Sequence, residues 1–497
     1  MTPGCGHFLY DVNVYMARFS ENFLLSTPVA ERLFHTYAQA QPILDFHCHL
    51  TAETILRNER FRDLHHIWLE GDHYKWRLMR ADGAAERLCT GDAPPWEKFA
   101  AWARTAPRTL RNPIAHWNQL ELVRYFGIDQ PLNEASAPEI WKRANEMLAG
   151  DELRPQAILR KFKVRAVCTT DDPADDLAAH RELARHPAPA QVFPTFRPNA
   201  IAQLDEPGVF RAWLDRLGPQ ANIEIARLAD LEQALRLRHQ AFHELGCRAS
   251  DHGLLACPRE ISPRPEAERL FETLRAGRAL PPEEAERMCG FLLDLCARLD
   301  AEQGWAMQLH LGALRNVNPP MMRRLGRDTG FDTISDRPLA AGLAAFLGRL
   351  SEANALPKMV LYNLNPAGNY ILATLAGCFQ GGSTPGKIQL GSAWWFLDHK
   401  PGIEAQLNAL SETGLLARFV GMVTDSRSFL SYPRHEYFRR VLCNLIGREL
   451  ESGELLAEEK AAGEMIADIC YANAERYFQF PLANAAAAKN MPATRPA

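Results

Sequence analysis

The sequence lacks any apolar run that approaches the ~20 residues needed to cross a lipid bilayer. Its first residues, MTPGCGHFLYDVNVYMARFS, lack the basic region followed by an apolar segment that is typical of a secretory signal. A formal net charge of −4 over 497 residues gives no electrostatic attraction to nucleic acid or to an anionic membrane surface. We therefore expect a cytoplasmic protein that binds neither nucleic acid nor membrane.

A pattern of paired cysteines is also missing. The 11 cysteines are scattered, odd in number and contain no C-x-x-C pair, which indicates reduced thiols rather than a disulfide scaffold. The apolar fraction of 47% and the charged fraction of 23% are ordinary for a globular protein. The length allows one large domain with insertions or two to three smaller ones, and this size favours an enzyme.

The sequence has no repeat of 20–50 residues. No glycine-rich phosphate loop follows its first β-type run, which argues against a doubly wound open sheet, the main alternative fold. The sequence does have eight short β-type runs, most of them separated by helical stretches. They cover residues 43–49, 164–170, 190–198, 246–252, 305–312, 359–366, 387–395 and 418–427. Most are nearly continuous apolar runs, as strands buried on both faces must be. Strands that alternate with helices indicate a parallel sheet, and eight such units predict a (β/α)₈ barrel.

The spacing of these runs predicts where the barrel is interrupted. About 110 residues separate the first run from the second, so we expect a helical insertion over about 51–160. A smaller helical insertion is expected after the fourth run, over about 255–304, with a helix that starts at paired prolines and stops at Gly304. The barrel with its insertions is expected to cover residues 21–480.

The two ends of the chain are expected to lie outside this barrel. Residues 1–20 are predicted to be a poorly ordered extension, with Met16 as an alternative start. Residues 481–497 form a low-complexity segment that we expect to be a disordered tail. Thr27 followed by Pro28 is typical of a helix start, because threonine caps the helix and proline suits its first position.

Reactive side chains gather at the C-terminal ends of the predicted strands, which is the edge where barrel enzymes build their active sites. The run ILDFHCHL, residues 43–50, ends in His47 and His49. Side chains alternate along a strand, so both imidazoles leave the same face while Cys48 points into the packing. An isolated H-x-H often occurs by chance, and two polar loop residues are the alternative interpretation.

Asp425, in VGMVTDSRS at the end of the eighth run, is the natural third metal ligand, because strands 8 and 1 are neighbours in a closed barrel. Two imidazoles and a carboxylate suit Zn²⁺, and an open coordination position would mark a catalytic site. A turn cap is the alternative role for Asp425. His310, on the fifth run, could be a metal ligand, a substrate contact or a buried core histidine.

Arg197, Arg315 and Arg427 lie at or just past predicted strand ends, where a guanidinium group could hold a carboxylate through two hydrogen bonds. Three arginines beside a candidate metal site indicate a small anionic substrate, although most arginines are solvated surface residues. Asp251 and His252 close the fourth run, where they could move protons or cap a helix.

Long motifs in this chain resemble those of the uronate isomerase (glucuronate isomerase) family of the amidohydrolase superfamily. The resemblance runs from about residue 20 to 480 and rests on DFHCHL, GDHYKWRLMR, AERLCTGDA, TTDDP, SDH, HLGALRN, GFDTISDRP, GSAWWF and VGMVTDSRSFLSYPRHEYFRR. It implies a (β/α)₈ barrel with a helical insertion after the first strand, which agrees with the spacing of the runs. On the sequence alone, the tryptophans of GSAWWF are most simply packing residues, and a role in a pocket wall is the alternative.

Matched by motif, the resemblance implies a metal site at His47, His49 and Asp425. The implied substrate-binding and catalytic residues are His73, Tyr74, Arg197, Asp251 and Arg427. Hydrolases of the superfamily usually hold two metal ions, with a carboxylated lysine or a glutamate on strand 4 and histidines on strands 5 and 6. Here strand 6 reads LYNLNP and has no histidine. We therefore expect one divalent metal ion, with Zn²⁺ as the expected species.

The resemblance implies an aldose–ketose isomerisation, of D-glucuronate to D-fructuronate and of D-galacturonate to D-tagaturonate. Arg197 would mainly hold the substrate carboxylate, with further substrate contacts from Arg427, Arg315 and His310. Tyr74 or Asp425 would act as the base that moves a proton between C2 and C1 through a cis-enediol, and a direct hydride shift is the alternative.

Further roles and rival functions stay open on the sequence. His73 and Asp251 would handle hydroxyl protons or ring opening. The rival functions are a metal-dependent hydrolase, such as a lactonase or deaminase, and a catalytically silent sugar-acid binder. We also expect a homo-oligomer.

Overall fold

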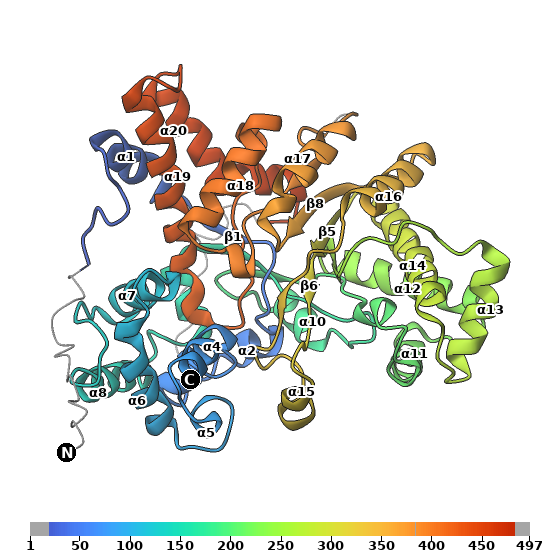
Figure 1. Cartoon of the computed structure of the whole chain (residues 1–497), viewed down its shortest axis with the longest axis horizontal. Helices are drawn as coiled ribbons and strands as arrows, with labels where there is room; N and C mark the ends of the chain where they lie inside the picture. The colour runs from blue at the N-terminus through green and yellow to red at the C-terminus, as the bar shows by residue number, and fades with distance from the viewer. Residues whose placement is uncertain (1–18, 383, 483–497) are drawn as a thin grey trace, which may run out of the picture. The chain divides into compact units, whose positions relative to one another are not determined.

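The computed structural model describes residues 19–382 and 384–482, which form a mixed α/β structure with two compact units (Figure 1). The smaller unit comprises the described residues of 19–23, 60–154 and 318–331, and the larger unit comprises 24–59, 155–317 and 332–482. The predictions for residues 1–18 and 483–497 lie outside the described residues. Among the described residues, no helix combines the length and apolar character that a membrane span requires.

The smaller unit is helical. Its helices are α3 (Leu64–Trp68), α4 (His73–Ala81), α5 (Glu86–Cys89), α6 (Pro95–Thr105), η2 (Ala106–Arg108), α7 (Pro113–Phe126), α8 (Ala137–Leu148) and α15 (Pro319–Leu325). Trp68, Phe99 and Trp102 are buried among these helices and form the centre of their core. The Trp68 indole donates a hydrogen bond to the buried Glu121 carboxylate, so the large ring does not leave its N–H unsatisfied.

The larger unit contains two parallel sheets. The first has the order β1 (Ile43–Asp45), β2 (Val164–Cys168), β3 (Gln191–Phe193), and the second has the order β4 (Ala249–Leu254), β5 (Ala306–Leu311), β8 (Lys358–Asn363), β9 (Ile388–Leu390). Phe196, just beyond β3, makes isolated parallel bridges to Asp171 and to Ser250, and so links the two sheets. Two short strands, β6 (Ala313–Leu314) and β7 (Thr333–Ile334), pair in antiparallel fashion.

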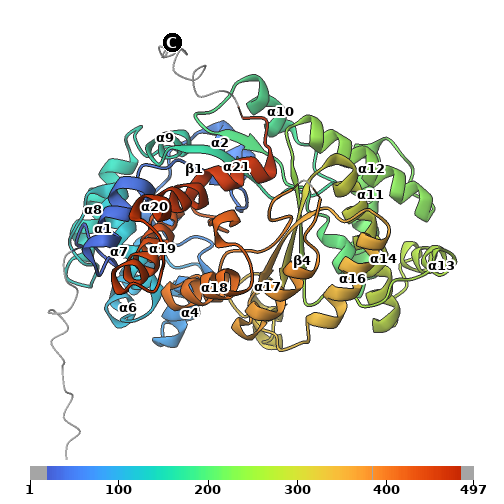
Figure 2. The ribbon, with the colours of Figure 1, turned by 90° about the horizontal axis from the view of Figure 1, so that it is seen from above.

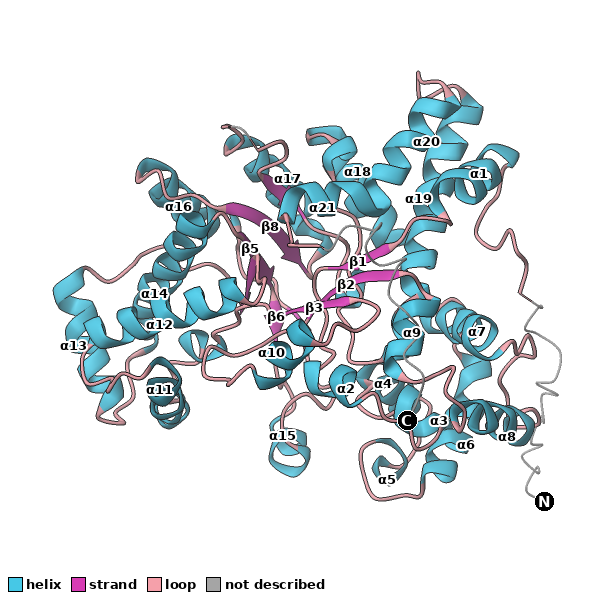
Figure 3. Cartoon of the chain, turned by 180° about the vertical axis from the view of Figure 1, so that it is seen from behind, coloured by secondary structure: helices cyan, strands magenta, loops and turns pink. Residues whose placement is uncertain are grey.

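Helices of the larger unit lie outside these strands (Figures 2 and 3). The α-helices are α1 (Pro28–Leu33), α2 (Ala52–Arg57), α9 (Pro155–Lys161), α10 (Ala178–Arg185), α11 (Pro207–Ala221), α12 (Leu228–Glu244), α13 (Arg264–Arg275), α14 (Pro282–Gln303), α16 (Ala340–Glu352), α17 (Asn369–Cys378), α18 (Lys400–Thr413), α19 (Pro433–Ser452), α20 (Glu459–Ala467) and α21 (Asn473–Phe478). The 3₁₀- and π-helical segments are η1 (Phe34–Ala38), η3 (Asn199–Ala202), η4 (Pro366–Gly368), η5 (Trp395–Leu397), η6 (Leu416–Arg418), η7 (Phe429–Ser431) and η8 (Asp468–Ala472). Every residue of β5 is buried, as expected for a strand covered on both faces.

The predicted ends of two helices are confirmed. The Thr27 side chain caps α1 by accepting a hydrogen bond from the Ala30 N–H, and Pro28 occupies the first position of the helix. Helix α14 starts at Pro282 and ends at Gln303, where the left-handed Gly304 (φ +68°) caps it. The ten cysteines in the described part of the chain are free thiols, in agreement with the predicted lack of a disulfide scaffold.

The prediction of a regular strand over residues 418–427 is wrong. Seven of the eight predicted runs contain a parallel strand, whereas this one has no strand assignment after η6. Gly421 (φ +81°) and Asp425 (φ +43°) adopt left-handed conformations, which interrupt the extended backbone that a ladder needs. The segment nevertheless lies beside the end of β1, because the Asp425 N–H donates to His47 O (3.2 Å) and the His49 N–H donates to Ser426 O (2.9 Å).

Candidate active site

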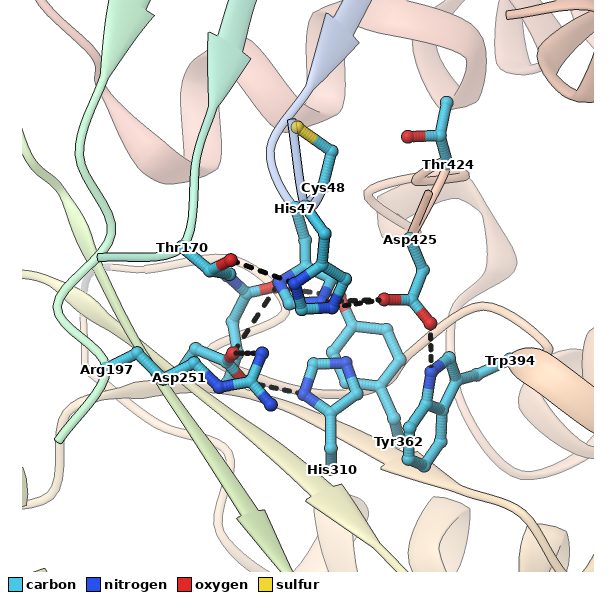
Figure 4. Close-up of polar contacts among 12 residues, drawn as sticks. His47, Cys48, Thr170, Arg197, Asp251, His310, Tyr362, Trp394, Thr424 and Asp425 are labelled. Carbon is cyan, nitrogen blue, oxygen red and sulfur yellow. Dashed lines mark hydrogen bonds and ion pairs between the residues drawn. The ribbon is translucent and has the colours of Figure 1, made fainter. Parts of the chain in front are cut away.

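His47, His49 and Asp425 meet at the end of β1. Figure 4 shows the His47 and Asp425 side chains facing each other. The Nε2 atoms of His47 and His49 each lie 3.1 Å from the same Asp425 oxygen, Oδ1. Ligand atoms of the three residues all lie within 4.8 Å of one another. Two neutral imidazoles and one carboxylate are ligands that a divalent metal ion accepts, so the donor set fits such an ion.

Asp425 is held in this position by its backbone and by both carboxylate oxygens. Its φ of +43° is unusual for a residue with a side chain, and such strain persists only where surrounding contacts hold it. The Trp394 indole N–H donates a hydrogen bond to Asp425 Oδ2 (Figure 4). Although burial favours the neutral acid, the hydrogen bonds from His47 and His49 hold the pKa of Asp425 well below its ordinary value. The carboxylate is therefore ionised and faces both imidazoles.

The pKa values of the two histidines shift in opposite directions. Burial lowers the pKa of His49 to about 4, so this ring is neutral near pH 7. Its Nδ1 lies 2.9 Å from Thr170 Oγ1, which orients the ring so that Nε2 faces Asp425. Burial also disfavours a charge on His47, but the carboxylates of Asp251 and Asp425 raise its pKa above the ordinary value.

A second group of ligand-type side chains shares His47. His47, Asp251 and His310 are all buried and also bring ligand atoms within 4.8 Å of one another. Asp251 Oδ1 lies 2.7 Å from His310 Nδ1, and Asp251 Oδ2 lies 3.8 Å from His47 Nδ1. Arg197 Nη1 lies 2.9 Å from the same Asp251 Oδ2 (Figure 4). The Arg197 guanidinium therefore contacts a buried carboxylate of the protein itself.

The electrostatics of this second group follow from burial and pairing. Burial alone would raise the pKa of Asp251, but Arg197, His310 and His47 hold it well below its ordinary value. Burial lowers the pKa of His310. The His310 ring stacks on Tyr362, with centroids 4.3 Å apart and an angle of 2° between the rings. These contacts fix the His310 plane in front of His47.

Two further predicted residues lie in flanking segments of the larger unit. Arg427 is exposed and follows Asp425 by two residues. Arg315 follows β6, where its Nη1 lies 3.3 Å from Asp332 Oδ2 and its guanidinium lies 4.7 Å from the Trp395 ring centroid. Both side chains are close in sequence to site residues, but their roles as substrate contacts stay predictions.

His73 and Tyr74 belong to the smaller unit. They start α4, whose N-terminus is capped by the Asp72 side chain, and their rings stack on each other with centroids 4.8 Å apart. Tyr74 also makes an edge contact with Trp117. Their participation in the site of the larger unit stays a prediction.

A cavity of about 470 Å³ opens beside His49 and Thr170. Its other lining residues include the acidic side chains Glu53, Asp171, Asp175 and Asp176. Burial raises the pKa of Asp171 to about 7. An acidic lining repels anions, so this cavity suits a neutral or cationic group better than a carboxylate.

Sequence reasoning missed two contacts of the metal-ligand candidates. Trp394 was interpreted as packing, yet it bonds Asp425, and Thr170 had no assigned role although it lies against His49. Both follow predicted strands at their C-terminal ends, in GSAWW and TTDD. Their position at a strand end indicated that both residues could belong to the site, but it did not indicate which side chain each of them contacts.

Comparisons with known proteins match this chain to one enzyme family. The family model described as glucuronate isomerase matches residues 16–478. Uronate isomerases of Solibacter usitatus and Opitutus terrae are 52% and 51% identical to this chain over 462 residues, which is 93% of this chain and 99% and 98% of those proteins.

Two solved structures are similar in fold. The uronate isomerase of Thermotoga maritima has a TM-score of 0.87 and 33% identity, covering 93% of this chain and 100% of that one. The glucuronate isomerase of Caulobacter crescentus has a TM-score of 0.86 and 26% identity, covering 94% and 98%. The match extends over nearly the whole chain and includes the segments that carry the site, so the chain belongs to the glucuronate isomerase family.

Proposed function

We propose that this protein is a uronate isomerase, which converts D-glucuronate to D-fructuronate and D-galacturonate to D-tagaturonate. The observation that carries the proposal is the meeting of His47, His49 and Asp425 beside the ion pair of Arg197 with the buried Asp251, in a chain of the glucuronate isomerase family. The site combines ligands for a metal ion, which can polarise a carbonyl or hydroxyl oxygen of a uronate, with arginines, which can bind its carboxylate.

The proposed scaffold is a (β/α)₈ barrel over residues 21–480, with helical insertions over about 51–160 and 255–304. The parallel orders β1-β2-β3 and β4-β5-β8-β9, and the bridges at Phe196 between them, support this architecture. In this architecture the segment 419–427 would take the place of the eighth strand, and its backbone bonds to His47 and His49 beside β1 support that position.

His47, His49 and Asp425 would hold one divalent metal ion, with Zn²⁺ as the proposed species. When bound, such an ion acts as a Lewis acid that polarises a carbonyl or hydroxyl oxygen of the substrate. The neutral state of His49 and the ionised state of Asp425 are the forms that metal ligation requires.

The arginines would hold the substrate carboxylate. Arg197 already pairs with Asp251, so part of its charge is compensated within the protein. Arg427 and Arg315 are more exposed and would share the carboxylate, while His310 would contact a hydroxyl group. The acidic cavity next to His49 would repel the carboxylate, which favours a substrate orientation toward the arginines.

Isomerisation needs a base that removes the C2 proton and returns it to C1. The low pKa of Asp425 makes this carboxylate a weak base, which favours Tyr74 for the task. Tyrosine ordinarily titrates near 10, so Tyr74 would need a cationic neighbour to lower its pKa. His73 and Asp251 would handle hydroxyl protons or ring opening.

The test is to incubate the protein with each uronate, with and without a chelator, and to measure ketose formation. In D₂O, deuterium at C1 of the product is expected if the proton passes through an enediol. Its complete absence would indicate a hydride shift or a proton shielded from solvent. Acid release from a sugar lactone without ketose formation would contradict the proposal and favour a metal-dependent hydrolase. Binding of both uronates without turnover of either would indicate a sugar-acid binder.

A further inference from the structure

A buried contact between Asp45 and Thr424 lies behind the metal-ligand candidates. Asp45 is the last residue of β1 and is fully buried, as is Thr424. The Thr424 N–H donates to Asp45 Oδ1 (2.9 Å), and the Thr424 hydroxyl donates to Asp45 Oδ2 (2.6 Å). We propose that this contact is a positioning device, which sets the adjacent Asp425 against His47 and His49 and thereby determines metal affinity.

The contact is strongly directional because one residue satisfies both carboxylate oxygens. A buried carboxylate is costly unless its oxygens accept hydrogen bonds, so Asp45 is stable in this place only while Thr424 stays beside it. Hydrogen bonds to a charged group are also stronger than those between neutral groups. Asp45 therefore fixes both the backbone and the side chain of Thr424, 379 residues away in the sequence.

Asp425, the next residue, needs such a support. Its left-handed backbone (φ +43°) is strained for a residue with a side chain. A regular strand would hold the segment through a ladder of hydrogen bonds, but residues 419–427 have no strand assignment. The contacts that hold the segment include the Asp45–Thr424 contact, the Trp394 hydrogen bond to Asp425 and two backbone bonds, from the Asp425 N–H to His47 O and from the His49 N–H to Ser426 O.

The alternative is that Asp45 and Thr424 contribute only to stability. Loss of their contact would then lower the melting temperature and leave metal affinity unchanged. Positioning predicts that metal affinity falls as well, because Asp425 would relax away from the two imidazoles. Thr105 provides a matched control in α6 of the smaller unit, since its buried hydroxyl donates to Asp82 Oδ2 at 2.9 Å.

The experiment uses the full chain and Zn²⁺ alone as the probe, with the dissociation constant measured by competition with a chromophoric chelator. Thr424→Val removes the hydroxyl and keeps the shape, and we expect it to weaken Zn²⁺ binding about 10- to 100-fold. Thr424→Ser keeps the hydroxyl and should stay within about threefold of the unaltered protein. Thr105→Val should lower the melting temperature without changing Zn²⁺ affinity.

Unchanged Zn²⁺ affinity in Thr424→Val would overturn the inference, and so would equal losses in Thr424→Val and Thr105→Val. If Thr424→Val does not fold, Asp45→Asn replaces it, because the amide oxygen can accept from the Thr424 N–H while the amide N–H donates to the Thr424 hydroxyl, both as weaker neutral hydrogen bonds. We then expect roughly three- to tenfold weaker binding, and unchanged binding would again overturn the inference.

This inference rests on the proposed metal site and not on the proposed reaction. An unaltered chain that binds no Zn²⁺ would overturn the metal site and the positioning role together. Bound Zn²⁺ without ketose formation would instead overturn only the proposed reaction. The two failures are therefore distinguishable by measuring Zn²⁺ binding and turnover on the same protein.

Discussion

The Arg197 guanidinium lies just beyond β3 and contacts side chains of the protein itself. In the sequence it follows a predicted strand and has no visible partner, so a substrate carboxylate is its natural ligand. In the structure its guanidinium lies 2.9 Å from the buried Asp251 carboxylate, and its Nε donates to Asn199. Arg197 therefore stabilises a charge of the protein, whatever it also offers to a substrate.

We predict that Arg197→Met lowers the free energy of unfolding by about 3 kcal/mol, because it leaves a buried carboxylate without its charge partner. The measurement is urea unfolding at neutral pH. Arg337→Met is the matched control, since Arg337 pairs with Glu286 but its side chain is 44% exposed. An exposed pair contributes about 1 kcal/mol or less, so equal losses in the two variants would contradict the prediction.

At the scale of elements, alternate side chains of β4 face opposite sides of the strand. Asp251 points to the site, whereas its neighbours Ser250 and His252 belong to a buried network on the other face. In that network Ser250 donates to Asp300 of α14, whose other oxygen lies 2.9 Å from His239 of α12. The network connects the strand that carries Asp251 to the helices behind it.

His252 should make stability depend on pH. Burial lowers its pKa from 6.5 to about 4, so between these values the unfolded chain binds a proton at His252 and the folded chain does not. The free energy of unfolding should therefore fall as the pH is lowered from about 6.5 to 4, by up to about 3 kcal/mol from this residue. His252→Gln removes this contribution, so its stability profile over that window should be flatter.

The measurement is chemical unfolding at several pH values between 4 and 7. His186→Gln is the control, because the His186 side chain is 76% exposed and its surroundings change little on unfolding. If His252→Gln and the unaltered protein lost stability in parallel over this range, the buried histidine would not be the cause.

The conformation of the segment 419–427, which lies beside the end of β1, depends on Gly421. This residue has φ +81°, and a Cβ atom there would lie 2.3 Å from the backbone oxygen of Ile469. Gly421→Ala should therefore destabilise the protein through both backbone strain and a clash, by about 2–4 kcal/mol. Gly453→Ala isolates the strain, because Gly453 has φ +80° and nothing within 4 Å of the added Cβ.

Urea unfolding of both glycine variants measures the difference. The expected order of stability is the unaltered protein, then Gly453→Ala, then Gly421→Ala. A Gly421→Ala variant as stable as Gly453→Ala would show that the segment shifts freely, and would contradict the close packing against Ile469.

At the scale of the whole molecule, metal binding should be linked to stability. A ligand that binds only the folded state raises the free energy of unfolding, by about 2.7 kcal/mol at a free concentration of 100 times its dissociation constant. We predict that Zn²⁺ raises the melting temperature of the chelator-treated protein. Asp425→Asn should lose most of this shift, since it removes the charged ligand of the proposed site.

Thermal unfolding of both proteins with increasing Zn²⁺ tests this link. Because the chain forms two compact units, each unfolding transition should be followed separately. The Zn²⁺ effect is expected in the transition of the larger unit, which contains His47, His49 and Asp425. An equal shift in Asp425→Asn would place the bound Zn²⁺ elsewhere.

Local patterns in the sequence were sufficient for much of the fold. Apolar runs indicated seven parallel strands, and Thr27, Pro28 and Gly304 marked helix ends that the structure has. The same runs predicted an eighth strand that is not regular, because an apolar run does not reveal that Gly421 and Asp425 adopt left-handed backbones.

The amino-acid sequence alone was enough to identify the residue types of the site and their order along the chain: two histidines at the end of the first β-type run, and an aspartate near the end of the last. Their partners could be identified only in the folded protein, because side-chain contacts depend on which distant segments pack together. Asp425 meets His47 and Trp394, Arg197 meets Asp251, and Asp45 meets Thr424 across long separations in sequence. Periodicity reports which residues share a face of one element, whereas burial and charge pairing are properties of the folded assembly of elements.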